Sequence, residues 1–248
     1  MKYLLPAALI LCLWQSVVWV SDVPAFILPP PAKVAVTLWG NRALLAEHAI
    51  VTLSEVMIGL LLGAILGMVT ALGLAMAPRL DRWLKPVLVL SQSIPVFALA
   101  PILTLWFGYG LWSKIMMALL IIYFPVTSAF HDALVATPPA WLRQAEVMGG
   151  TRWRVLWFLR VPAALPGLMS GLRLAAVYAP IGAIIGEWVG ASRGLGYLML
   201  LSNGRAKTDL MFAAVLVVAV MTILLHAAVN RLACKIENKS RGQAEPSL

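Results

Sequence analysis

Long stretches of apolar residues, separated by short polar, glycine-rich or proline-rich segments, follow one another along almost the whole chain. A helix that spans a bilayer needs about 20 predominantly apolar residues to cross ~30 Å of hydrocarbon. Segments that reach or approach this length lie at residues 4–20, 53–77, 87–107, 115–130, 166–189 and 210–230. The pattern therefore predicts an all-α membrane protein with about six transmembrane helices.

The first apolar segment has the length and flank of a signal peptide, because it is short and follows Lys2. Its far end, however, carries the bulky Trp14 and Trp19, and no convincing small-x-small cleavage pattern follows. We therefore expect this segment to be retained as a helix.

Composition excludes a water-soluble globule. The chain is 62% hydrophobic and 12% charged, against about 45–50% apolar and about 25% charged in soluble domains. Its net charge of +9 would suggest nucleic acid in a soluble protein, but Lys and Arg in membrane proteins gather in cytoplasmic loops. We expect contact with membrane lipid and no nucleic-acid partner.

The distribution of the basic residues predicts the orientation. Twelve Lys and Arg lie on the side that holds both predicted termini and six on the other, so both termini should be cytoplasmic. Residues 1–236 are predicted to form the transmembrane domain. The polar residues 237–248 are predicted to be a disordered cytoplasmic tail.

The longest connection on the predicted cytoplasmic side covers residues 131–165. It is too polar to span the membrane, and it carries Pro138-Pro139 followed by a helix-capable stretch. A structured loop of this length usually has a function. On the outer side, residues 21–52 contain three prolines at 29–31, followed by a stretch that could form a short interfacial helix.

Glycines recur every four residues in two of the predicted helices, at Gly59, Gly63 and Gly67 and at Gly182, Gly186 and Gly190. This spacing leaves a strip without side chains on one helix face, where a neighbouring backbone can approach closely. Plain helix packing is the simpler interpretation, and a contact that slides during function is the alternative.

Prolines interrupt the third apolar segment at Pro95 and Pro101 and the fifth at Pro180. Each removes a backbone hydrogen bond, and at membrane depth the freed carbonyls need protein or water around them. The break either lines a solute path or is a kink that fits its neighbours. The polar residues beside Pro95 that such a path would use are Ser91, Gln92 and Ser93.

Acidic residues are scarce in the apolar segments, and Glu187 lies near the outer end of the fifth. An ionised carboxylate there is costly unless it is paired or hydrated. Glu187 is therefore either a gate or path residue, or an interfacial carboxylate paired with a nearby arginine such as Arg193.

Enzyme motifs are weak or missing in the sequence. Residues 190–194 match G-x-S-x-G, which in a six-helix protein resembles the rhomboid intramembrane serine proteases and would need Ser192 activated by His226. A glycine-rich turn explains the same residues without catalysis. No phosphate-binding loop and no His-Glu-x-x-His motif occur, so we expect neither ATP hydrolysis by this chain nor a metal site.

The cytoplasmic loop carries the most specific motif. Arg143, Gln144, Ala145 and Glu146 lead to Gly149-Gly150, and after nine residues from Gly149 the chain reads Leu159-Arg160-Val161-Pro162. This resembles the signature E-A-A-x-x-x-G, nine residues, I-x-L-P of permease subunits of type I ATP-binding-cassette importers. Here Arg143 stands in place of the family's Glu, and Gln144 in place of the first Ala.

The resemblance covers nearly the whole chain. Residues 29–34, 93–95, 105–110, 172–174 and 190–197 are similar to the branch of that family that imports nitrate, sulfonates, taurine and pyrimidine precursors of thiamine. It implies a homodimer in the bacterial inner membrane, two ATPase subunits that bind ATP and Mg²⁺, and an extracytoplasmic solute-binding protein. It also implies that the 131–165 loop couples the ATPase to the solute path.

A secondary transporter or channel is the alternative to an ATP-driven importer. Such a protein would need no partner subunit, but it should carry coupling charges deep in its helices and often an internal repeat. Neither is evident in the sequence. Among the substrates of the branch, the amino-acid sequence of the third apolar segment favours a thiamine pyrimidine precursor.

Overall fold

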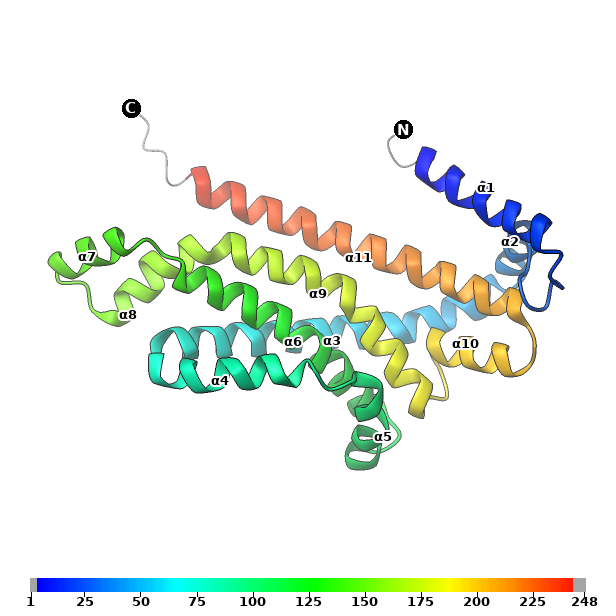
Figure 1. The fold of residues 1–248 in the computed structure, drawn as a ribbon, viewed down its shortest axis with the longest axis horizontal. Coiled ribbons are helices and arrows are strands. Elements are labelled where there is room, and N and C mark those ends of the chain that lie inside the picture. Colours follow the sequence, from blue (N-terminus) through cyan, green and yellow to red (C-terminus); the bar gives the residue numbers. More distant parts are fainter. Residues whose placement is uncertain (1–3, 243–248) are drawn as a thin grey trace.

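A computed structural model describes residues 4–242, and within that range the chain is helical with no strand (Figure 1). The helices that make up the bundle and its two ends are, in chain order, α1 (Leu4–Ser21), α2 (Pro31–Gly40), α3 (Arg42–Met76), α4 (Pro78–Ser91), α5 (Val96–Phe107) and α6 (Leu111–Val135). The second half of the chain contributes α7 (Pro139–Val147), α8 (Arg152–Val155), the π-helical turn η1 (Leu156–Arg160), α9 (Val161–Gly190), α10 (Leu195–Gly204) and α11 (Thr208–Gly242).

Four of the described helical stretches are long and apolar enough to cross a membrane: α3, α6, α11 and the continuous run from α8 through η1 to α9. They contain the predicted segments 53–77, 115–130, 210–230 and 166–189, apart from Ala77, which caps α3. The apolar part of α1, Ala8–Ser21, is shorter than a full span. The count of six spans and the side on which the termini lie stay predictions.

The third predicted segment is not one helix. It divides into α4 and α5, which are bent by 98° relative to each other and count as a fifth span if taken together. The break falls at residues 92–95, and Pro95 directly precedes α5. The interruption expected at Pro101 is wrong, because α5 continues through it, as does α9 through Pro180.

The glycines of α3 and α9 lie where helices pack most closely. A Cβ atom added to Gly182 would lie 2.6 Å from the Cα of Ala118 on α6, and one added to Gly63 would lie 2.7 Å from the Ile122 side chain. Gly59, Gly67 and Gly186 also face α6. Because α6 is thus held between α3 and α9, these three helices form the core of the bundle.

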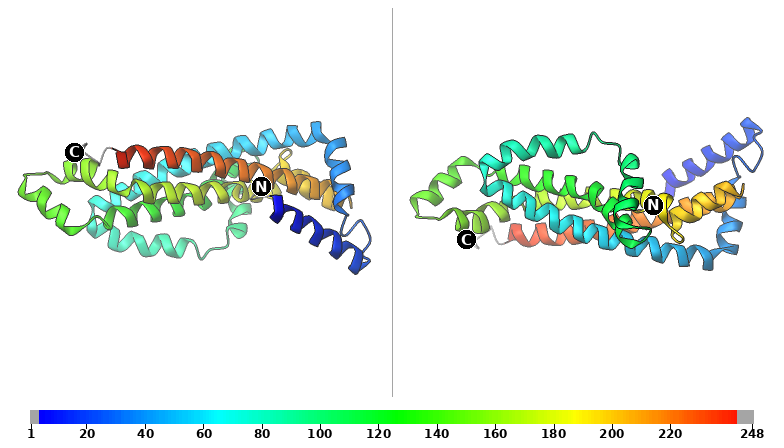
Figure 2. Two further views of the ribbon diagram at one scale, coloured as in Figure 1. Left: turned by 90° about the horizontal axis from the view of Figure 1, so that it is seen from above. Right: turned by 90° about the horizontal axis from the view of Figure 1, so that it is seen from below.

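The bundle has two distinct ends (Figures 1 and 2). The α7–α8 hairpin and the end of α11 lie at one end, whereas α2 and α10 lie at the other. The helix α1 lies apart from the bundle at this second end and contacts it through Trp14, which stacks on Phe212 with ring centroids 5.5 Å apart.

The described part of α11 ends at Gly242, six residues beyond the boundary of 236 predicted for the transmembrane domain. Residues 237–242 are therefore helical rather than part of a disordered tail. The helix is tied back to the bundle there, because Glu237 forms a 2.9 Å ion pair with Arg173 of α9. The rest of the predicted tail, 243–248, lies outside the described residues.

Candidate functional site

The hairpin of α7 and α8 is shaped by prolines and glycines. Pro139 is the first residue of α7, where its missing N–H costs no hydrogen bond. The helix ends in two backbone bonds typical of a Schellman motif: the Gly150 N–H donates to Ala145 O at 2.8 Å, and the Gly149 N–H donates to Glu146 O at 2.9 Å. Gly149 has a φ of +74°, which a residue with a Cβ adopts only with strain.

This hairpin exposes large apolar side chains at the end of the bundle. Val147, Met148 and Phe158 are 90%, 79% and 83% exposed. A groove of about 700 Å³ runs beside them, and its lining includes Trp141, Gln144, Ala145, Met148, Gly149, Gly150, Arg154, Val155, Phe158 and Leu159. An exposed apolar patch of this kind is typical of a surface that binds another protein.

Most of the predicted coupling residues lie on this hairpin, and the other two lie just after it, in η1 and at the start of α9. Gln144, Ala145, Gly149, Gly150 and Leu159 line the groove. Arg143 and Glu146 are exposed on α7, and Pro162 is the second residue of α9.

The break between α4 and α5 lies beside a cavity of about 750 Å³. Among the predicted path residues, Gln92 lines it. Ser91 is exposed at the end of α4, and Ser93 and Pro95 are exposed in the turn. The other lining residues come from α5, α6 and α9 and are Val96, Phe97, Ile121, Phe124, Pro125, Ser128, Ala129, Leu174, Tyr178, Ile181 and Ile185. None of these described side chains carries a charge at neutral pH.

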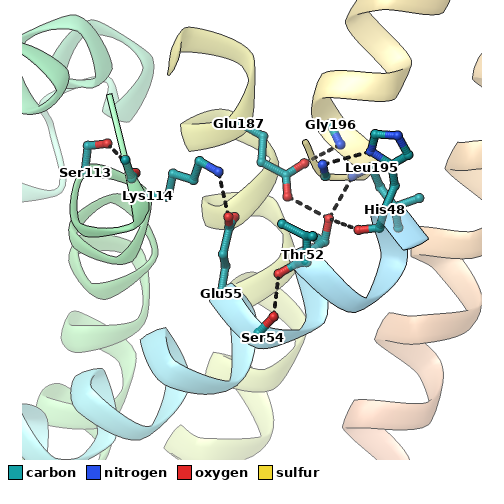
Figure 3. A network of polar contacts seen from close by, with 12 residues as sticks. His48, Thr52, Ser54, Glu55, Ser113, Lys114, Glu187, Leu195 and Gly196 are labelled. Atoms are coloured by element: carbon teal, nitrogen blue, oxygen red, sulfur yellow. Dashed lines mark hydrogen bonds and ion pairs between the residues drawn. The ribbon is translucent and has the colours of Figure 1, made fainter. Parts of the chain in front are cut away.

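Glu187 does not line this cavity. It is 1% exposed and lies between α3 and α10, where its carboxylate accepts hydrogen bonds from the Thr52 hydroxyl at 2.6 Å and from the Gly196 N–H (Figure 3). The predicted alternative, a pair with Arg193, is wrong: Arg193 is exposed and lies 3.9 Å from Glu47. Sequence proximity suggested Arg193, but one buried partner, Thr52, lies 135 residues away, and the other is a backbone N–H group nine residues away.

Side chains of α3 and α9 satisfy the first N–H groups of α10, which has no side-chain cap of its own because Gly194 precedes it. The Leu195 N–H donates to Thr52 Oγ1 at 2.8 Å, and the Gly194 N–H donates to His48 Nδ1 at 2.9 Å. The Nδ1 atom of His48 is therefore the acceptor in this bond.

A second buried contact adjoins this cluster. Lys114 on α6 donates to Glu55 Oε1 on α3 at 2.7 Å, and the two side chains are 9% and 1% exposed. Sequence reasoning missed both residues as a site, because Lys114 is one of the six basic residues that the charge count assigned to the outer side. The carboxylate of Glu55 inside the segment 53–77 was the signal that a buried partner was needed.

The structure separates the two residues that a protease would need. His226 on α11 lies 3.4 Å from the carbonyl oxygen of Arg173, whereas Ser192 follows the end of α9 at Gly190. At 1.5 Å per residue, Arg173 and Gly190 are roughly 25 Å apart along α9. Ser192 and His226 therefore do not form a catalytic pair.

The model of the family described as "Binding-protein-dependent transport system inner membrane component" matches residues 59–241. The chain belongs to this family. It is thus the permease of a binding-protein-dependent importer and a multi-pass membrane protein, and the alternatives of a secondary transporter, a channel or a protease are not supported.

Individual relatives agree with the family. The permease is 48% identical to a probable ABC transporter permease protein of Haemophilus influenzae, over 94% of this chain and 95% of that protein. It is 37% identical to a formylaminopyrimidine transport permease protein of Halalkalibacterium halodurans, over 84% and 83% of the two chains. These matches confirm the predicted membership in the branch of type I importers.

A solved structure supports the fold. An inward-facing structure of the MetNI methionine ABC transporter matches with a TM-score of 0.69 at 20% identity, and the match covers 79% of this chain and 98% of the other. At that identity the match shows the arrangement of helices alone. It confirms the type I permease fold for this protein.

Proposed function

We propose that this permease forms the solute path of an ATP-driven importer in the bacterial inner membrane, as a homodimer with both termini in the cytoplasm. Two separate ATPase subunits bind ATP and Mg²⁺, and an extracytoplasmic solute-binding protein delivers the solute. This chain binds no cofactor and catalyses no reaction itself.

The observation that carries the proposal is the α7–α8 hairpin. It projects from one end of the bundle on a helix, α8–η1–α9, that continues through the core. Its apolar groove offers a surface for the ATPase. Approach of the two ATPases on binding ATP would move both hairpins and turn the helices above them, since packed helices switch between discrete arrangements.

We propose a neutral heteroaromatic solute of the pyrimidine class, in preference to taurine, another sulfonate or nitrate. The supporting observation is the cavity beside the α4–α5 break, which includes Phe97, Phe124 and Tyr178 together with the polar Gln92 and Ser128 but no charge to balance an anion. The named formylaminopyrimidine relative points to the same class.

Uptake into proteoliposomes tests the proposal. The permease is co-reconstituted with its ATPase, and the loaded binding protein is added on the side that corresponds to the cell exterior. We expect uptake of a radiolabelled aminopyrimidine that requires ATP, Mg²⁺ and the binding protein. Uptake of taurine or nitrate but not of the pyrimidine would overturn the substrate class. Uptake that continues without ATP would overturn the importer mechanism.

A further inference from the structure

Arg160 occupies a special position at the base of the hairpin. It is the last residue of the π-helical turn η1, directly before α9. The proline two residues later explains this turn: Pro162 has no N–H to donate to residue 158, so the regular α-helical ladder is interrupted. Instead the Val161 N–H donates to Leu156 O, a bond across five residues. Single π-helical turns within α-helices are frequent at functional sites.

The guanidinium of Arg160 binds the ends of two other helices. Its Nε donates to the carbonyl oxygen of Leu134 at 3.0 Å, in the last turn of α6. Its Nη1 donates to the carbonyl oxygen of Ala75 at 3.1 Å, in the last turn of α3. Carbonyls in the last turn of a helix have no partner within the helix, and a cation is favoured at that end. Arg160 therefore joins three of the long helices at one point.

This contact is the polar link between the hairpin region and α3. Among the described residues, both side-chain hydrogen bonds that connect residues 139–160 with other long helices come from Arg160. A cavity of about 250 Å³ lies beside it, between the α3–α4 corner and the hairpin residues Leu142, Glu146 and Gly150. The packing around the link is thus incomplete, so the arginine bridges a gap that apolar side chains do not fill.

We infer that Arg160 is a positioning residue that couples hairpin movement to α3 and α6 as well as to α9. This inference rests on the proposed function. The helix α9 is continuous with the hairpin, and α6 precedes it by a short connection, but α3 has no backbone link to residues 139–160. When the hairpin is displaced, the hydrogen bond from the Arg160 guanidinium to Ala75 O moves the end of α3 in the same direction. A lysine in place of Arg160 cannot present two donors in a fixed plane.

Three variants test this in the reconstituted importer: Arg160→Gln, Arg160→Lys and, as a matched control, Arg79→Gln on the exposed start of α4. The measured quantity is the number of ATP molecules hydrolysed per solute imported, together with the amount of intact complex. We expect the control to match the parent protein. For Arg160→Gln we expect this ratio to rise about tenfold or more, as is expected for loss of hydrogen bonds from a charged group. Arg160→Lys should be intermediate.

The outcomes separate the inference from the proposed function. An unchanged ratio in Arg160→Gln, with transport falling only in proportion to the amount of complex, would show a purely structural role and overturn the inference. If Arg160→Gln does not assemble, the same ratio is measured for Arg160→Lys at matched amounts of complex. An unchanged ratio in that variant would likewise overturn the inference. A parent complex that imports solute without hydrolysing ATP would overturn the proposed function as well.

Discussion

Lys114 and Glu55 form an ion pair of 2.7 Å that is almost completely buried between α6 and α3. The pair lies one helical turn from Thr52, which bonds Glu187 and the start of α10. Four helices, α3, α6, α9 and α10, are therefore joined by one continuous polar cluster inside an otherwise apolar bundle. Removing a partner from such a cluster costs more than the bond itself, because a buried charge is left without compensation.

The first prediction concerns this ion pair. Lys114→Met leaves the Glu55 carboxylate buried and unpaired, so it should lower the free energy of unfolding by about 3–5 kcal/mol. The double variant Lys114→Met with Glu55→Met removes both charges and should recover much of that loss. Thermal denaturation of the purified protein in detergent measures both. Equal losses in the single and double variants would contradict the importance of the unpaired charge.

The second prediction concerns Thr52, whose hydroxyl donates to Glu187 and accepts from Leu195. Thr52→Val keeps the shape but leaves two buried polar groups unsatisfied, a cost of about 1–3 kcal/mol for each group. We expect α10 to become accessible to protease and hydrogen exchange. Thr52→Ser keeps the hydroxyl and should protect α10 as the parent does. Equal protection in Thr52→Val and Thr52→Ser would argue against the role of the hydroxyl.

The third prediction concerns the sharp exit from α7. Gly149→Val forces a β-branched side chain into a positive φ, which costs at least about 1–2 kcal/mol, and should distort the groove beside the hairpin. We expect transport to be lost while the protein remains in the membrane in normal amount. The control Gly40→Ala, at an open position with an ordinary φ, should transport normally. Normal uptake by Gly149→Val would count against coupling through this loop.

The fourth prediction concerns the contact of α9 with α6. Gly182→Ala places a Cβ atom 2.6 Å from the Cα of Ala118, so the helices must separate, at a cost of about 1–3 kcal/mol. Gly73→Ala on α3 meets nothing within 4 Å and should be neutral or slightly stabilising, since alanine favours helix more than glycine. Melting temperatures of both proteins measure the difference. If the Gly182→Ala protein is as stable as the parent, α9 and α6 can separate without a measurable cost, and the prediction is wrong.

Local patterns in the sequence were sufficient to predict the long helices and the position of the hairpin. Apolar length identified α3, α6, α9 and α11, and Pro138-Pro139 marked the start of the helix-capable stretch that forms α7. Partners that are distant in sequence were not predictable in this way. Nothing local indicates that Glu55 meets a lysine 59 residues later, or that Glu187 binds the backbone of α10 rather than Arg193. The bend after Gln92 was expected at Pro95, but its angle depends on packing against α6 and α9.

The close fit of α6 between α3 and α9 has a consequence for biosynthesis. During translation α6 enters the bilayer before α9 does, because it precedes α9 in the chain and the hairpin region lies between them. In that interval, lipid or the membrane insertion machinery must cover the face around Ala118 that Gly182 later occupies. The buried ammonium of Lys114, in contrast, can pair with Glu55 at once, since α3 is already inserted. The ion pair thus gives the newly inserted α6 a defined neighbour before the last helices of the core arrive.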